Sequence, residues 1–465
     1  MVSPDPSLVV RMPGEVFVAT DELLAHLPLL AELADDLEHD AHRLGLLSLD
    51  YPLGPLRKAL DECERRTFDA ADTVRRLRAG IITAELGYAQ AERTAIALVD
   101  VASNWATAVF APWLGPLALP PLVVGGAMVA SDQDRRAAVT SWILDHPEAI
   151  TSPEFSALVR RVVTGADDAI LGRIVPPWVL MLLGDHGLGL LGVGTTAAVV
   201  TGVSARLGAR VLNETPVSVE RVGSTVGTAP PAGAAERLAR VPEEKQVRIE
   251  RYSAPGEEDR FIVYVAPTQS FSPVAGEEPW DLTSNIVGVG GLSSGSIRAT
   301  EQAMAEAGIG PESPVVLVGY SQGGIVTDAI TGSGRWNVKG LETYGDPGGT
   351  IALPDGVRGV AVRHSDDFVV ATGGPQPPVD RVIVERRAFP EGSAIPTDKP
   401  VPAHQKDAYA ETARRIDDAA SPAIRGELAY LDAFARDYSG REAAEVTTFE
   451  YRAERVSGSS SGVGR

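Results

Sequence analysis

The sequence predicts an α/β protein in which a mostly parallel sheet follows an all-α region. Residues 18–100 carry apolar side chains at helical spacing, and β-branched runs begin near residue 211. After that point, strand-like and helical segments alternate, the order typical of a parallel sheet covered on both faces. A chain of 465 residues is longer than one hydrophobic core usually supports. We therefore expect a helical domain over 1–210, an α/β domain over 211–457 and a disordered tail over 458–465.

Composition excludes several classes of function. The formal charge of −20 repels phosphate backbones, so no nucleic-acid partner is expected. The one cysteine, Cys63, allows neither an internal disulfide nor a thiolate metal cluster, and we expect it to be buried on a helix. The first residues, MVSPDPSLVVRMPGE, lack the charged start and apolar stretch of a Sec signal peptide.

Two long helices are predicted over residues 18–44 and 54–100, joined by the turn-like segment LSLDYPLGP. Residues 105–130 and 174–203 are nearly free of ionisable side chains and are long enough to span a bilayer. Prolines and glycines interrupt both segments, which leaves backbone groups unpaired in lipid. We expect buried helices there, with contact to a membrane surface left open.

The predicted strands lie in seven segments, most of them with alternating or β-branched residues. A hairpin-like connection, APGEE, joins the second segment to the third. In chain order the segments are VSVERVGSTVG, QVRIERYS, DRFIVYVAP, PVVLVGYS, VKGLETYGDP, VRGVAVRH and DRVIVERR.

The segment Gly319-Tyr320-Ser321-Gln322-Gly323 carries the clearest sign of chemistry. It follows a buried strand and opens the helix GGIVTDAI, which is the context that makes a G-x-S-x-G pattern specific. Bulky residues at 319 and 323 would clash in so tight a turn. The helix start offers backbone N–H groups to an oxyanion. These features predict a nucleophilic serine at Ser321.

A serine hydroxyl needs a base, and two of the seven histidines follow Ser321. His364 lies inside a predicted strand, where a structural role is expected. His404 lies on a loop that enters a helix, in PVPAHQKDAYAETA, from which an imidazole can reach the sheet edge. We predict His404 as the base.

The acid is expected at the carboxyl end of a strand between Ser321 and His404. Asp346 in TYGDPGG and the pair Asp366–Asp367 in RHSDDFVV qualify. Neighbouring residues of an extended segment point to opposite sides, so at most one of the pair faces His404. We assign Asp367, with Asp366 and Asp346 as the alternatives.

GYSQGG, TYGDPGG and HSDDFV together resemble the lipase class 3 succession of G-H-S-x-G-G, T-F-G-x-P and H-x-x-D-x-V. VYVAPTQSF, PWDLTSN, LVGYSQGG and AHQKDAY are similar to segments of uncharacterised actinobacterial α/β hydrolases. Those proteins often have an N-terminal region like the WXG-type hairpins of type VII secretion, and their fold resembles PE-PPE and cutinase-like domains. The resemblance covers residues 245–440 well and the first 210 loosely, and YPLG stands where a W-x-G would be.

The resemblance implies an α/β-hydrolase catalytic domain over 211–457 and an oxyanion hole in two parts. The first donor is the backbone N–H of Gln322. The second comes from the loop that corresponds to the pattern P-G-T-Q. In this loop Pro267 stands in place of the glycine and is followed by Thr268 and Gln269. Since proline lacks an N–H, Thr268 is our candidate, with Gln269 close behind.

The sequence therefore predicts a serine esterase that cleaves a small-molecule or lipid ester, or transfers its acyl group, and needs neither cofactor nor metal. A thioesterase, a peptidase, or a secreted or membrane-associated interaction protein built on a hydrolase scaffold remain alternatives. The protein is expected in the cytoplasm, or outside the cell after type VII-like export without a Sec signal. Membrane association and the oligomeric state stay open. The Y-x-x-x-E matches at Tyr88 and Tyr438 are expected by chance.

Overall fold

The computed structural model describes residues 8–12, 15–17, 27–49, 54–76, 78–79, 141, 145–164, 214–227, 229–271, 275–348, 353–374, 381–436 and 445–456. The chain divides into two compact units. One comprises Met1–Val9 with Glu15–Ala97, and the other comprises Val10–Gly14 with Leu98–Arg465. The predicted segments at 105–130 and 174–203 and the tail at 458–465 lie outside the described residues.

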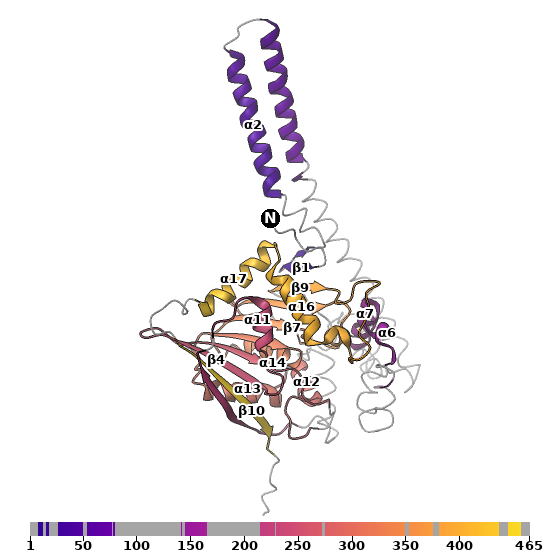
Figure 1. Cartoon of the computed structure of the whole chain (residues 1–465), viewed down its shortest axis with the longest axis vertical. Coiled ribbons are helices and arrows are strands. Elements are labelled where there is room, and N and C mark those ends of the chain that lie inside the picture. Colours follow the sequence, from indigo (N-terminus) through magenta and orange to yellow (C-terminus); the bar gives the residue numbers. More distant parts are fainter. Residues whose placement is uncertain are drawn as a thin grey trace, which may run out of the picture. The chain divides into compact units, whose positions relative to one another are not determined.

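The smaller unit contains a hairpin of two helices, which Figure 1 shows in indigo. α2 (Leu27–Leu49) is followed by a helix over residues 55–76, and the short strand β2 (Glu15–Phe17) precedes them. The first helix extends to Leu49 and so includes the first residues of the predicted turn. The expected hairpin is therefore present, with its first helix ending later than predicted.

Small side chains form the buried positions of this hairpin, namely Ala34, Ala41, Ser48 and Ala71. Cys63 is exposed, so the prediction that it is buried is wrong. It lies on the same helix as Ala71 but eight residues earlier, a spacing that rotates it by about 80° around the helix axis.

A mixed sheet forms the centre of the larger unit. Its strands follow the order β9-β8-β7-β6-β5-β4-β10-β3, and β1 (Val9–Met12) lies beside β9. The strand bounds are β3 Val217–Val226, β4 Val247–Ser253, β5 Arg260–Val265, β6 Val315–Tyr320, β7 Val338–Tyr344, β8 Arg358–His364, β9 Val382–Arg386 and β10 Glu445–Arg455.

Strands β5 to β9 are parallel, as the sequence predicts, while β4, β10 and β3 pair antiparallel. The α/β class and the N-terminal helical region are thus confirmed, but the sheet is mixed rather than mostly parallel. The antiparallel part has two sources. β4 and β5 form the hairpin predicted at APGEE, and β10, from near the end of the chain, pairs with β4 on one side and β3 on the other.

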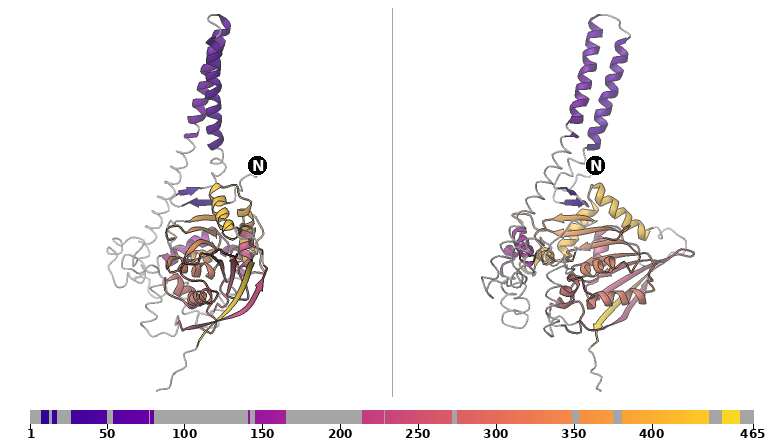
Figure 2. Two further views of the ribbon diagram at one scale, coloured as in Figure 1. Left: turned by 90° about the vertical axis from the view of Figure 1, so that its left-hand side faces the viewer. Right: turned by 180° about the vertical axis from the view of Figure 1, so that it is seen from behind.

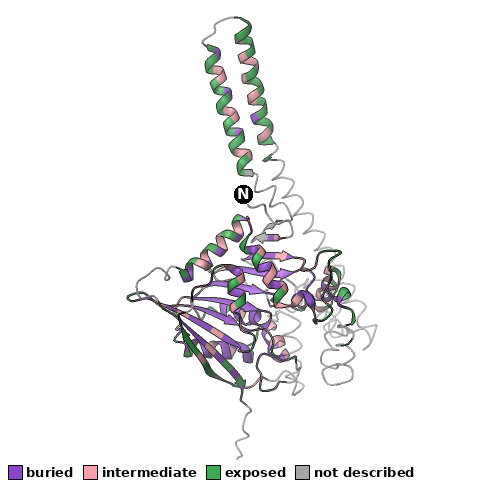
Figure 3. Cartoon of the chain, viewed as in Figure 1, coloured by how far each residue is buried: buried purple, intermediate pink, exposed green. Residues whose placement is uncertain are grey.

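Helices cover both faces of the sheet (Figures 1 and 2). One layer holds α11 (Gly233–Arg240), α16 (Lys406–Asp417) and α17 (Pro422–Arg436). The other holds α12 (Leu282–Val289), α13 (Gly295–Glu306) and α14 (Gln322–Gly332). Figure 3 shows the central strands buried, and every residue of β6 is buried. This double cover explains the uninterrupted apolar sequence of β6.

Four short elements complete the description. They are α6 (Pro147–Ile150), α7 (Pro153–Thr164), α15 (Phe368–Ala371) and the 3-10 turn η3 (Pro402–His404). α7 packs against α15, with the rings of Phe155 and Phe368 edge to face at 5.5 Å. Among the helices of the described residues, none is both long and apolar enough to cross a membrane.

Candidate active site

Ser321 lies at the tight connection between β6 and α14. Its backbone has φ 55° and ψ −119°, a conformation that residues with a Cβ rarely adopt, and its N–H donates to the Tyr344 carbonyl at 2.8 Å. Such strain costs about 1–3 kcal/mol and persists where the surrounding structure imposes it. The turn thus presents the serine at the carboxyl end of the central strand, directly before the N-terminus of α14.

Glycine is required at three positions around Ser321, because neighbouring backbone and side-chain atoms leave no space for a Cβ atom. A Cβ at Gly319 would lie 2.3 Å from the Gly323 carbonyl oxygen, and a Cβ at Gly323 would lie 2.2 Å from that of Val265. A Cβ at Gly324 would lie 2.5 Å from the Cβ of Asp346. The expected clash at 319 and 323 is therefore present, and the end of β5 packs directly on the turn.

The structure brings Ser321, His404 and Asp367 together. His404 Nε2 lies 2.8 Å from Ser321 Oγ, and His404 Nδ1 lies 2.6 Å from Asp367 Oδ2. The second contact requires the proton on Nδ1, because an ionised carboxylate can only accept. Nε2 is then free to accept the serine proton. Ser321 and Asp367 are 6% and 1% exposed, so water competes little for these bonds.

The two alternative carboxylates have other partners. Asp366 accepts hydrogen bonds from the backbone N–H groups of Ala388 and Phe389, at 2.8 and 3.0 Å. Asp346 lies beneath α14 and accepts from Gly348 N–H at 2.6 Å. Burial raises the pKa of both carboxyls. Of the three candidates, Asp367 is thus the one that contacts His404.

Tyr409 of α16 supports Asp367 from behind. Its hydroxyl donates to Asp367 Oδ2 at 2.9 Å and accepts from the backbone N–H of His364 at 3.2 Å. Its ring stacks on the His364 imidazole at 3.8 Å between centroids. The hydroxyl and the His404 imidazole share one carboxylate oxygen, which fixes the direction of the carboxylate. Asp367 Oδ1 in turn accepts from Val369 N–H at the start of α15.

His364 holds the segment that carries His404. Its Nδ1 lies 2.7 Å from the Ala403 carbonyl oxygen and its Nε2 lies 2.8 Å from Thr412 Oγ1. Burial lowers the pKa of His364 to about 4, so the ring is neutral at pH 7. The predicted structural role of this histidine agrees with these contacts.

A second strained residue, Val401, precedes the histidine. It has φ 48° and ψ 66°, although it is β-branched and is followed by Pro402. Its carbonyl accepts from His404 N–H at 2.9 Å, and the hydroxyl of Tyr320 donates to the His404 carbonyl. Within the described residues, Ser321 and Val401 are the non-glycine residues with positive φ. Backbone strain is therefore concentrated at the serine and the histidine.

The predicted oxyanion donors lie on elements that meet at the turn that carries Ser321. Gln322 is the first residue of α14, so its N–H has no partner within the helix. Thr268 follows β5, whose last residue packs on Gly323, and its Oγ1 accepts from Asn285 Nδ2 at 2.9 Å. The N–H of Gln269 donates to the Trp280 carbonyl at 2.8 Å. That bond removes Gln269 as a donor and leaves Thr268 as the candidate.

Sequence reasoning missed Tyr409, Tyr320 and Val401. Tyr409 belongs to the buried stripe of α16, together with Thr412, Ala413 and Ile416, at helical spacing. That pattern predicts a buried tyrosine five residues after the histidine. It does not indicate that the hydroxyl reaches Asp367, because this contact depends on where β8 ends.

No protein-family model, no curated protein and no solved structure matches the chain. What the site can do therefore follows from its own geometry. A hydroxyl, an imidazole and a carboxylate in hydrogen-bonded series, next to a helix N-terminus, can perform nucleophilic attack on a carbonyl. Among the described residues, no group of three His, Cys, Asp or Glu side chains could hold a metal ion.

Proposed function

We propose that the chain is a serine hydrolase of the α/β-hydrolase type that cleaves carboxylic esters through an acyl-enzyme. The observation that carries the proposal is the series of hydrogen bonds from Ser321 Oγ through His404 to Asp367. The strained backbone of Ser321 supports it, since such strain is retained mainly where it serves a function.

In the proposed reaction, His404 Nε2 takes the proton of Ser321 as Oγ attacks the ester carbonyl. Asp367 stabilises the imidazolium through the Nδ1–H bond. The oxyanion accepts from the N–H groups of Gln322 and Thr268, each typically worth ~3 kcal/mol. His404 then protonates the leaving alcohol, and water releases the acyl group.

The substrate is proposed as an ester with an apolar acyl group. The loop after β5 supports this, because Phe271 is 79% exposed three residues after the proposed oxyanion donor. Leu292, after α12, is 47% exposed. Short- to medium-chain p-nitrophenyl esters are suitable first substrates, and the length dependence of kcat/KM reports the size of the acyl site.

The first experiment is labelling of the purified full-length protein with a fluorophosphonate probe. We expect wild type to label, and Ser321→Ala and His404→Ala to lose labelling. Thermal unfolding of the same samples serves as the control for folding. A folded wild type that neither labels nor turns over p-nitrophenyl esters above the Ser321→Ala background contradicts the proposal.

Asp366 provides a matched control for the acid. Asp367→Asn removes the acceptor that holds the Nδ1 tautomer and is expected to lower kcat by about 10⁴-fold, the loss typical of such triads. Asp366→Asn removes the same charge one residue away and is expected to change kcat less than about tenfold, because Asp366 contacts backbone amides instead. Equal losses in the two variants would contradict the assignment of Asp367.

A non-catalytic scaffold receives no support from the site. A disused site would be expected to lose the alignment of its serine and histidine, whereas these side chains lie 2.8 Å apart. Thioesters and peptides can be attacked by the same three residues, so they are tested as competing substrates in the same assay.

A further inference from the structure

α7 precedes the predicted α/β domain in the chain, yet it packs against α15, the single helical turn that follows Asp367. The rings of Phe155 and Phe368 meet edge to face, with 5.5 Å between their centroids. Near the other end of α7, a Cβ at Gly374 would lie 3.6 Å from Val163 Cγ1. α7 therefore contacts the chain from the first residue of α15 to just beyond its last.

The carboxylate of Asp367 belongs to α15 as well as to the series of hydrogen bonds with His404. Asp367 is the N-cap residue of this helix, and its Oδ1 accepts from Val369 N–H at 3.0 Å. Its Oδ2 lies 2.6 Å from His404 Nδ1. Because one planar group makes both contacts, a displacement of α15 also turns the oxygen that contacts His404.

α15 depends on its surroundings for its position. It has four residues, which are too few to form a stable helix without packing. Val370 and Ala371 are buried, and the chain after them passes so close to Pro347 that a Cβ at Gly373 would clash with the Pro347 carbonyl oxygen. The second contact that holds α15 is the one that α7 makes through Phe155.

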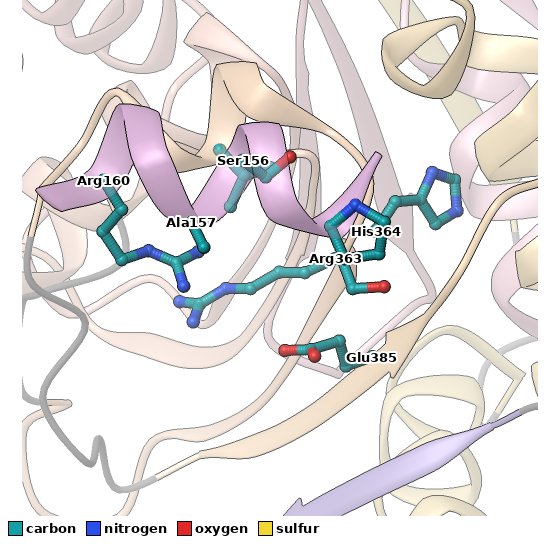
Figure 4. A pocket seen from close by; sticks show the side chains of 9 residues that line it. Ser156, Ala157, Arg160, Arg363, His364 and Glu385 are labelled. Atoms are coloured by element: carbon teal, nitrogen blue, oxygen red, sulfur yellow. The ribbon is translucent and has the colours of Figure 1, made fainter. Parts of the chain in front are cut away.

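The middle of α7 packs less closely. A pocket of about 190 Å³ lies between this helix and the carboxyl ends of β8 and β9, lined from α7 by Ser156, Ala157 and Arg160. Figure 4 shows these side chains, with the imidazole of His364 turned away from the pocket. A helix makes fewer contacts where such space remains, so the aromatic pair at Phe155 carries a larger share of the contact between α7 and α15.

We infer that α7 positions the acid of the proposed triad, with Phe155 as the residue that holds α15 and hence the Asp367 carboxylate. Phe155 acts through Phe368 and takes no part in the reaction, so it is a positioning residue. The inference rests on the proposed hydrolase function. It gives a segment that precedes the α/β domain a role in the same reaction.

Two measurements on full-length Phe155→Ala and wild type test the inference. The first is the rate of fluorophosphonate labelling, which is expected to fall at least about fivefold, because small displacements of catalytic groups are costly. The second is the proton NMR signal of His404 Nδ1–H. Its bond to a carboxylate places this signal far downfield, and its absence from Asp367→Asn identifies it. We expect the signal to weaken or broaden in Phe155→Ala.

Leu158→Ala is the matched control, because Leu158 lies on the same helix and is 56% exposed. It should keep the labelling rate and the downfield signal of wild type. Phe155→Leu retains most of the apolar volume without the ring, and it should show both changes to a smaller extent if Phe155→Ala does not fold. In a Phe368→Ala background, Phe155→Ala should cause no further loss, because the ring through which it acts is already missing.

The outcomes separate this inference from the proposed function. A folded Phe155→Ala that labels at the wild-type rate and keeps the downfield signal overturns the positioning role and leaves ester hydrolysis intact. If wild type shows the signal but does not label, ester hydrolysis fails, whereas loss of the signal in Phe155→Ala still supports the positioning role. Wild type with neither labelling nor signal contradicts both.

Discussion

At the scale of single residues, Asp367 Oδ2 accepts two hydrogen bonds, from His404 Nδ1 and from the Tyr409 hydroxyl. The tyrosine is fully buried, so its bond to the carboxylate is not exchanged for water. We expect Tyr409→Phe to lower the rate of fluorophosphonate labelling by about tenfold, since a hydrogen bond to a charged group contributes about 1.5–3 kcal/mol. The expected cause is that the Asp367 carboxylate is no longer held in the direction of His404, since Tyr409 itself does not react.

Tyr430→Phe is the matched control, because Tyr430 lies on α17 and contacts Arg358 through its ring. It should label at the wild-type rate. The pH profile separates a positioning role from general destabilisation: Tyr409→Phe should shift the acidic limb of the labelling rate, while Tyr430→Phe should not. An unchanged rate and profile in a folded Tyr409→Phe would exclude the positioning role.

His364 makes stability depend on pH. Burial lowers its pKa from the ordinary value near 6.5 to about 4 in the folded state. Between these values the unfolded chain binds a proton and the folded chain does not, so stability falls as pH drops through this window. The contribution lost by pH 4 is about 3 kcal/mol.

The measurement is the free energy of unfolding from urea titrations at pH 7 and pH 4. Relative to His364→Gln, wild type should lose about 3 kcal/mol more over this range. The buried carboxyls with raised pKa, such as Asp346 and Asp366, act in the opposite direction but are common to both proteins, so they cancel in the difference. His42→Gln, at a histidine of α2, should follow wild type; parallel behaviour of wild type and His364→Gln would refute the prediction.

The sequence predicted that Ser321, His404 and Asp367 would come together, because their order in the chain and their positions after strands are local features. Ser321 is surrounded by glycines that a tight turn requires. His404 is one of only two histidines that follow Ser321 in the sequence. Strand position alone does not separate Asp367 from Asp366, and the resemblance of HSDDFV to H-x-x-D-x-V favours Asp367. The contacts of Tyr409 and the strain at Val401 are set by how α16 meets β8, and no short sequence pattern records that.

At the scale of elements, the connection between β6 and α14 depends on close approach by the end of β5. A Cβ at Gly323 would lie 2.2 Å from the Val265 carbonyl oxygen, and backbone cannot yield as a flexible side chain can. We expect Gly323→Ala to cost at least about 3 kcal/mol and to abolish labelling, because β5 and α14 must separate. Tryptophan fluorescence during urea unfolding measures the change.

Gly276→Ala provides the control, since a Cβ there meets nothing within 4 Å. It should unfold within about 0.5 kcal/mol of wild type and label normally. If Gly323→Ala also retained wild-type stability and labelling, the tight contact between β5 and the turn at Ser321 would be wrong.

The parallel strands could be predicted from sequence because each buried strand is followed by a turn and a helix. The antiparallel side could be predicted only in part, because the APGEE connection indicates the hairpin of β4 and β5 but nothing indicates where β10 pairs. β10 pairs with β4 and β3, whose residues lie about 200 positions earlier, as in the alignment of Phe449 with Ile249. The pattern of a single sequence shows where a strand lies but not which strand it pairs with. The place of β10 between β4 and β3 therefore became evident only from the structure.

At the scale of the whole molecule, the two units differ in how much core they contain. The described part of the hairpin buries only Ala34, Ala41, Ser48 and Ala71, whereas the larger unit has a continuous core around β5, β6 and β7. Leucines of the hairpin, such as Leu46 and Leu49, are exposed. Since helices gain most of their stability from packing, the hairpin should be the less stable part.

Unfolding should therefore occur in two steps that different probes resolve. All six tryptophans lie in the unit that contains residues 98–465, so their fluorescence reports that unit alone. Far-ultraviolet circular dichroism reports both units and should show helix loss at urea concentrations where fluorescence is still native. Ala41→Gly, which costs about 1 kcal/mol in a helix, should move only the early step. Ala299→Gly, at a buried alanine of α13, should move only the fluorescence transition, and coincident curves for both probes would contradict separate stability of the hairpin.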